Sequence, residues 1–230
     1  MTAAKSNTPR SRRQPVRPAG RGAGALSGSR VIPILAGVVV VGLAILIGVL
    51  STREAANVVA LDDIAGTVTV EGNRLTQFGG SVEGDPHVGQ PGPRVQGADF
   101  EGRAVTIGEP GAPTILSFMA SWCPACQQEL PVLVDWIDRG GLPADVDLVV
   151  ISTGLDDRRP NWPPDRWLER EGYDGPVLVD DVAGTVASVY GLSATPFWVV
   201  LDANGDIAMR FAGMLSEAQF DDLVAIARGQ

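Results

Sequence analysis

A run of twenty residues without a charged or hydrogen-bonding side chain, VIPILAGVVVVGLAILIGVL, divides this chain in two; it begins at Val31 and ends at Leu50. At about 1.5 Å per residue, a helix of this length spans about 30 Å, the thickness of the hydrocarbon core of a bilayer. The run is longer than the apolar core of a signal peptide, usually about 7 to 15 residues, and no A-x-A cleavage site follows it. The sequence therefore predicts a single retained transmembrane helix over residues 31–50 rather than a cleaved signal peptide.

Charged residues are distributed unequally on the two sides of this run. The residues before it include no acids and seven bases, which are Lys5, Arg10, Arg12, Arg13, Arg17, Arg21 and Arg30. All 27 acidic residues follow the run, against 11 arginines. Because basic residues stay on the cytoplasmic side of a membrane, the tail is predicted to be cytoplasmic and the acidic part extracytoplasmic. The excess negative charge of the acidic part would repel nucleic acid and anionic lipid.

Composition separates two further segments from the rest of the chain. Residues 1–30, rich in Ser, Pro, Gly, Ala and Arg, are predicted to form a disordered tail, since they bury too little surface to offset chain entropy. Residues 51–97 are turn-rich and predict an extracytoplasmic linker or N-terminal extension, with one short strand over residues 67–70. Residues 79–97 of this segment are predicted to be a loop, and His87 within it is expected to have no chemical role.

Residues 98–230 alternate between short apolar runs and helical periodicity, a pattern typical of an α/β domain with a mixed sheet. Strands are predicted over residues 114–120, 147–153 and 176–180, followed by a hairpin over residues 197–201 and 207–211. Helices are predicted over residues 127–139, 163–171, 182–190 and 216–228, the last with Ser216 as its N-cap. A chain of 230 residues that is 45% hydrophobic builds its own core and needs no cross-link to fold.

Both cysteines of the chain lie in one motif, SFMASWCPAC, where the first strand of this domain meets its first helix. A structural disulfide across so short a loop would stabilise the fold by only about 2 kcal/mol. A zinc site needs four ligands, and the chain offers only Cys123, Cys126 and the distant His87. Attachment of a c-type haem needs a histidine after the second cysteine, where this chain has Gln127. The pattern therefore favours a redox-active pair.

The start of the helix is expected to give the two cysteines different properties. A thiol at a helix N-terminus faces unpaired backbone N–H groups and the positive end of the helix dipole, which lower its pKa. Cys123 is predicted to lie in this field at an exposed helix start, with Pro124 at the first helical position. Cys126, one turn later, is predicted to point into the domain as the resolving thiol.

WCPAC after an apolar strand, within this order of strands and helices, resembles the thioredoxin superfamily. More narrowly, residues 90–230 resemble the membrane-anchored TlpA/ResA/DsbE (CcmG) group of extracytoplasmic thiol-disulfide oxidoreductases. Trp122 precedes the first cysteine as in the family, and Pro131 falls where these proteins kink the active-site helix. The segment Ser193-Ala194-Thr195-Pro196-Phe197 is similar to the family loop whose proline is cis and faces the disulfide. The family's strand-turn-strand follows as VVLDANGDI.

The resemblance implies a thioredoxin-like fold, a catalytic Cys123–Cys126 disulfide and a carboxylate, Glu129, near the buried cysteine. It also implies that four residues contact the substrate, which are Trp122, Pro124, Thr195 and Pro196.

The chain departs from related proteins at two places. Many cytoplasmic thioredoxins carry a buried aspartate six residues before the first cysteine, where this chain has Ser117. Glu129 is then the only carboxylate near the cysteines in sequence that could transfer a proton. The motif CPAC also differs from the CGPC of general reductants, and since the dipeptide tunes the reduction potential, the direction of electron flow stays open.

Three functions fit these observations. The first is an extracytoplasmic disulfide reductase, the second an oxidant of secreted protein thiols, and the third a non-catalytic binding domain whose disulfide is passive. The resemblance implies protein thiols and disulfides as partners, apocytochrome c or secreted proteins among them, and a membrane electron donor of the CcdA/DsbD kind. No nucleotide, flavin or metal motif is visible, so no cofactor is predicted.

Overall fold

The computed structural model describes residue 42 and residues 59–230, and the contacts group Val58–Gln230 into one unit. The predicted tail over residues 1–30 lies outside the described residues, and so does the predicted transmembrane helix over residues 31–50, apart from Gly42. Among the residues that the structure describes, no helix combines the length and the apolar composition needed to cross a membrane.

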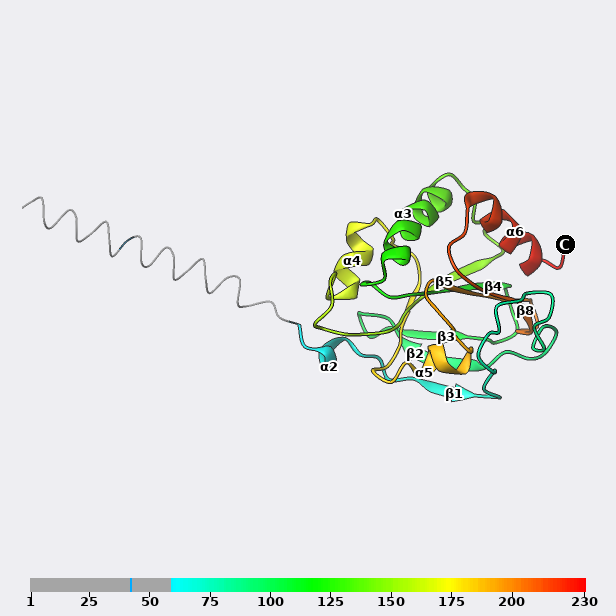
Figure 1. Cartoon of the computed structure of the whole chain (residues 1–230), viewed down its shortest axis with the longest axis horizontal. Helices are drawn as coiled ribbons and strands as arrows, with labels where there is room; N and C mark the ends of the chain where they lie inside the picture. Colours follow the sequence, from blue (N-terminus) through cyan, green and yellow to red (C-terminus); the bar gives the residue numbers. More distant parts are fainter. Residues whose placement is uncertain (1–41, 43–58) are drawn as a thin grey trace, which may run out of the picture. The chain divides into compact units, whose positions relative to one another are not determined.

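A five-stranded mixed sheet lies at the centre of this unit (Figure 1). Its strands, in the order β6-β5-β4-β7-β8, are β6 (Val177–Val179), β5 (Asp147–Ser152), β4 (Thr114–Met119), β7 (Phe197–Leu201) and β8 (Ile207–Ala212). The strands β4, β5 and β6 run parallel, β7 is antiparallel to β4, and β8 is antiparallel to β7. Because β4, β5 and β7 are buried on both faces, they appear in the sequence as continuous apolar runs.

Helices cover both faces of the sheet (Figure 1). The helices α3 (Pro124–Asp138), α4 (Pro164–Arg170) and α6 (Glu217–Ala227) share one core with Ile115 and Met119 of β4. The short helix α5 (Thr185–Val189) packs on the other face with Leu116 and Phe118 of the same strand. A further short helix, α2 (Leu61–Ile64), lies near the start of the described residues. Alternate residues of β4 therefore belong to opposite layers of the core.

From residue 114 onward, the predicted order of strands and helices is confirmed, and some boundaries differ. The helix expected over residues 127–139 begins three residues earlier, at Pro124. The helix expected over residues 182–190 begins later, at Thr185, because the buried Asp180 carboxylate accepts hydrogen bonds from the amides of Val186 and Ala187 and so fixes the first turn there. Ser216 is the N-cap of α6 and forms a capping box with Gln219.

A second, three-stranded antiparallel sheet, β1 (Thr69–Glu71), β2 (Arg94–Ala98) and β3 (Ala104–Ile107), packs beside α5 (Figure 1). The expectation that residues 79–97 are entirely loop was wrong at their end, since β2 begins at Arg94, and β3 was not predicted at all. Both strands are short, and β2 contains Gly97, so neither has a strong strand pattern in the sequence. They form because β2 pairs on both sides and because Val95 and Ile107 are buried in the core.

Residues between 59 and 97 also contribute to the core of the α/β unit. Leu75 and Phe78 are buried beside α5 and β7. The side chain of Asp85 forms an ion pair with Arg210 of β8, and the two side chains are only 0% and 1% exposed. The part of the predicted extension that the structure describes therefore packs within the same unit as the domain that follows it.

Candidate active site

The two cysteines lie where β4 ends and α3 begins. Cys123 is the N-cap residue of α3 and Pro124 is its first residue, so the chain enters the helix directly at the motif. Both cysteines are free thiols, and the backbone N–H of Cys126 donates a hydrogen bond of 3.4 Å to Sγ of Cys123. The structure thus places one sulfur at the helix N-terminus and the other one turn inside it.

The exposure of the two thiols differs less than the sequence predicted. Cys123 was expected at an exposed helix start, but the surrounding loops leave only 6% of it accessible. Cys126 is fully buried, at 0%. Cys123 is still the more accessible of the two, as predicted, so it is the sulfur that a partner can approach from solvent.

The two thiols differ strongly in their acidity. Partial burial raises the pKa of Cys123, but hydrogen bonding with the Thr195 side chain, with Cys126 and with the amides at the helix start outweighs this effect, so the pKa of Cys123 lies below the ordinary thiol value. Burial raises the pKa of Cys126 to about 12, and its hydrogen bond and charge interaction with Cys123 add to this effect. Near neutral pH, Cys123 is therefore the thiol that ionises first.

Glu129 lies on the same buried face of α3 as Cys126 and is 0% exposed. Burial raises the pKa of its carboxyl group to about 7, against the lowering effects of a hydrogen bond from the Leu215 amide and of the nearby Trp198 indole. A carboxyl group with this pKa is partly ionised at neutral pH, so it can either accept or release a proton.

The loop before β7 faces the first cysteine. The peptide bond between Thr195 and Pro196 is cis, as the resemblance implied, and the Cys123 thiol donates a hydrogen bond of 3.4 Å to the carbonyl oxygen of Thr195. Pro196 is buried, Thr195 is half-buried, and the two residues before them are exposed. The loop therefore lies directly beside Sγ of Cys123, and its outer part is open to solvent.

On the other side of the motif, Pro124 is exposed and Trp122 is half-buried. The indole Nε1 of Trp122 donates a hydrogen bond of 2.6 Å to the carbonyl oxygen of Gly154. The guanidinium group of Arg159 lies 4.7 Å from the centre of the Trp122 ring, within the range of a cation–π contact.

The loop after β5 forms this side of the site, and the sequence analysis missed it. In addition to Gly154 and Arg159, it contributes Asn161, whose side chain donates a hydrogen bond of 3.0 Å to the Ser121 carbonyl oxygen. No recognisable motif marks this loop. A topological signal was available, however, because β4 and β5 are parallel neighbours and the loops at their carboxyl ends must meet.

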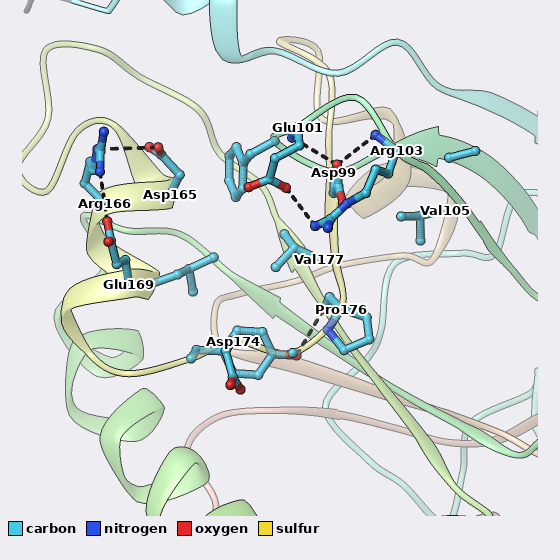
Figure 2. Close-up of a pocket in the computed structure, with 15 residues that line it drawn as sticks. Asp99, Glu101, Arg103, Val105, Asp165, Arg166, Glu169, Asp174, Pro176 and Val177 are labelled. Atoms are coloured by element: carbon cyan, nitrogen blue, oxygen red, sulfur yellow. Dashed lines mark hydrogen bonds and ion pairs between the residues drawn. The ribbon is translucent and has the colours of Figure 1, made fainter.

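A cavity of about 750 Å³ lies elsewhere, between the β2–β3 turn and α4 (Figure 2). Acidic and basic side chains pair with one another on its walls, Arg103 with Asp99 at 2.5 Å and Arg166 with Glu169 at 2.9 Å. None of the predicted site residues lines this cavity. It is therefore not part of the cysteine site.

A dithiol at the start of a helix, next to a cis-proline loop and on a mixed α/β sheet, is the arrangement of a thioredoxin-like thiol-disulfide oxidoreductase. Comparison with known proteins agrees with this class. Residues 87–226 match the Redoxin family, which is more than half of the chain, so the chain belongs to this family. The similar proteins include thiol:disulfide interchange proteins of the DsbE type and a thiol-disulfide oxidoreductase, ResA.

Three similar proteins illustrate the match. A thiol:disulfide interchange protein DsbE homolog of Paracoccus denitrificans is 31% identical over 132 residues, which cover 56% of this chain and 68% of that protein. The methylamine utilization protein MauD of Methylophilus methylotrophus is 29% identical, over 55% of this chain and only 56% of its own length. The crystal structure of a thioredoxin-family thiol:disulfide interchange protein of Chlorobium tepidum has a TM-score of 0.50 and 25% identity, covering 60% of this chain and 94% of that one.

Proposed function

We propose that this chain is a membrane-anchored, extracytoplasmic disulfide reductase that acts by thiolate exchange through Cys123 and Cys126. The observation that carries the proposal is the contrast between the two thiols. Cys123, at the helix start, has a lowered pKa and a small accessible surface, whereas Cys126 is buried with a pKa of about 12. Such a contrast suits a nucleophile and a resolving thiol.

In the first step, the Cys123 thiolate attacks one sulfur of a partner's disulfide. A mixed disulfide forms between Cys123 and the partner, and the other partner sulfur leaves as a thiolate. In the second step, Cys126 gives its proton to Glu129 and attacks Sγ of Cys123. The partner sulfur bound to Cys123 then leaves as a thiolate. The partner has gained two electrons, and this chain ends with a Cys123–Cys126 disulfide.

In the reductase direction, Glu129 would accept the proton of Cys126. Cys126 has to lose its proton before it attacks, and with a pKa of about 12 it does so rarely in neutral water. A carboxyl group with a pKa of about 7 on the same helix face provides an acceptor for this proton.

The partner is a protein disulfide presented on an extended segment. Trp122 and Pro124 flank Cys123 on one side, while the backbone of Thr195 and Pro196 lies on the other side and hydrogen-bonds to the segment as a neighbouring strand would. The name of a similar protein, thiol:disulfide interchange protein, supports thiol-disulfide exchange as the reaction. Apocytochrome c and secreted proteins both belong to this class of substrate.

A reductase of this kind has to be reduced again after each cycle. Two electrons must reach the Cys123–Cys126 disulfide from another dithiol, and the resemblance implies a membrane donor of the CcdA/DsbD kind for this step. The reduction potential of the pair tests the direction of flow: a value near that of thioredoxin, about −270 mV, supports the reductase. A value near that of DsbA, about −120 mV, would contradict it and indicate an oxidant of secreted thiols.

The proposed topology divides the chain into four segments. They are a cytoplasmic tail over residues 1–30, a membrane helix over 31–50, an extracytoplasmic extension over 51–97 and the thioredoxin-like domain over 98–230. The uncharged run and the basic residues before it support this topology. Alkaline phosphatase fused after Gln230 should be active, while the same enzyme fused after Arg30 should be inactive. An expressed but inactive fusion after Gln230 would contradict the topology.

A further inference from the structure

Three polar side-chain atoms beneath α3 are buried without a hydrogen-bond partner among the described residues. They are Oγ of Ser117, Nε1 of Trp198 and Oε2 of Glu129, and all three residues are 0% exposed. A polar atom left unpaired in a protein interior loses its hydration without compensation, so buried polar atoms are almost always hydrogen-bonded.

Ser117 and Trp198 are direct neighbours on the same face of the sheet. Ser117 of β4 lies opposite Trp198 of β7 in the antiparallel register, which places their Cβ atoms about 4.5 to 5.5 Å apart. Ile115 and Met119, two residues before and after Ser117, both belong to the core layer under α3, and so does Trp198. The hydroxyl and the indole therefore share this layer.

Glu129 reaches the same layer from above. It lies on the buried face of α3, and its Oε1 accepts a hydrogen bond from the backbone N–H of Leu215. Its Oε2 has no such partner, and the Trp198 indole lies close enough to influence the carboxyl group although it makes no hydrogen bond of regular geometry to it.

Charged groups of the neighbouring elements are engaged away from Glu129. Arg139 at the end of α3 pairs with Glu217 of α6 at 2.7 Å on the surface. Asp221 of α6 accepts a hydrogen bond of 2.9 Å from the indole of Trp136. The titratable group that shares the buried face of α3 with Glu129 is Cys126, one turn before it.

We propose that Ser117 and Trp198 are positioning residues for Glu129, whose Oε2 they hydrogen-bond directly or across one buried water molecule. The proposal rests on the proposed function only in the role that it gives to Glu129 as the acceptor of the Cys126 proton.

Both donors favour the ionised state of the carboxyl group. The indole N–H of Trp198 can only donate, so it favours the carboxylate. The hydroxyl of Ser117 also donates to the carboxylate, and because a hydrogen bond to a charged acceptor is stronger than one to a neutral acid, it favours the carboxylate as well. Together they keep the pKa of a fully buried carboxyl group low enough for Glu129 to be partly ionised at neutral pH.

The test measures the pKa of Glu129 directly in the full-length chain in detergent, by ¹³C NMR of carboxyl-labelled glutamate. Glu129→Gln removes the signal and so assigns it. Trp198→Phe and Ser117→Ala each remove one donor, and each should raise the pKa of Glu129 by about one unit. The fraction of carboxylate at pH 7, and with it the rate of the resolving step, should then fall about fivefold.

Trp136→Phe is the matched control, since both tryptophans pack on the ring of Phe220 at 5.4 Å. It removes an indole N–H from the same interface, but that N–H serves Asp221, so the pKa of Glu129 should not change.

An unchanged pKa of Glu129 in folded Ser117→Ala and Trp198→Phe chains would overturn the proposal, and so would an equal shift in Trp136→Phe. If Trp198→Phe fails to fold, the smaller change Ser117→Ala decides. If the pKa of Glu129 shifts but the pH profile of exchange does not change, the hydrogen bonds to Glu129 are supported. The role of Glu129 as the acceptor of the Cys126 proton is then contradicted.

Discussion

Replacing Arg210 should destabilise the fold far more than replacing an arginine on the surface. Its guanidinium group donates two hydrogen bonds of 2.7 Å to the carboxylate of Asp85, and its third nitrogen donates to the carbonyl oxygens of Thr76 and Tyr190 at 2.9 and 3.0 Å. The ion pair joins β8 to a segment more than a hundred residues earlier in the chain. Arg210→Met would leave two carbonyl groups without this donor and the Asp85 carboxylate without its counter-charge, with the backbone N–H of His87 as its remaining donor.

Breaking a buried ion pair by removing one partner costs about 3 to 5 kcal/mol, because the other charge is left uncompensated. The total stability of a domain is about 5 to 15 kcal/mol, so Arg210→Met should remove a large part of it. Asp85→Asn should cost a similar amount. The double variant should lose much less than the sum of the two, since the second change removes the charge that the first one left unpaired.

Urea unfolding of the full-length chain, followed by tryptophan fluorescence, measures these losses. Arg139→Ala is the control, because its ion pair with Glu217 has side chains that are 57% and 54% exposed and should contribute less than about 1 kcal/mol. An Arg210→Met chain as stable as the Arg139→Ala chain would refute the reasoning.

The same ion pair predicts a loss of stability in acid, because the hydrogen bonds and charge of Arg210 outweigh the effect of burial and lower the pKa of Asp85 below 3.8. The stabilisation is present above about pH 4 and is lost as the pH falls through the lowered pKa, and an Asp85→Asn chain should not show this loss. Glu129→Gln should slow exchange and abolish the increase in the rate of the resolving step as the pH rises through about 7, and stopped-flow exchange at several pH values measures it. Iodoacetamide should modify Cys123 much faster than Cys126 at neutral pH, and peptide mass spectrometry shows which thiol reacts. Gly191→Ala should destabilise the fold, because φ is +74° and an added Cβ would lie 2.2 Å from the carbonyl oxygen of Thr76, and thermal unfolding measures the loss.

The order of strands and helices in the α/β domain could be predicted from the sequence because its strands are buried. β4, β5 and β7 are continuous apolar runs, and helices with an apolar face alternate with them. β2 and β3 could not be predicted, because they are short and are held by pairing with distant segments. Asp85 likewise lies in a turn-rich stretch, and nothing near it in sequence indicates its partner Arg210.

Some features of the candidate site could likewise be predicted from the sequence, and others could not. The WCPAC motif and the Thr-Pro loop are local patterns, so the sequence could indicate Cys123, Cys126 and Pro196. The hydrogen bond from Asn161 to Ser121 and the approach of Trp198 to Glu129 depend on how separate elements pack. The exposure of Cys123 was overestimated for the same reason, because loops from other parts of the chain cover it.

The most direct test of the proposed mechanism is the trapping of partner proteins by single-cysteine variants of the full-length chain, followed on non-reducing gels. Cys126→Ser leaves the accessible Cys123 without its resolving thiol, so mixed disulfides with partners should accumulate and should disappear on reduction. Cys123→Ser leaves only the buried Cys126, with its pKa of about 12, and should trap none. Adducts from Cys123→Ser alone, or none from Cys126→Ser, would contradict the assignment of Cys123 as the reacting end of the pair.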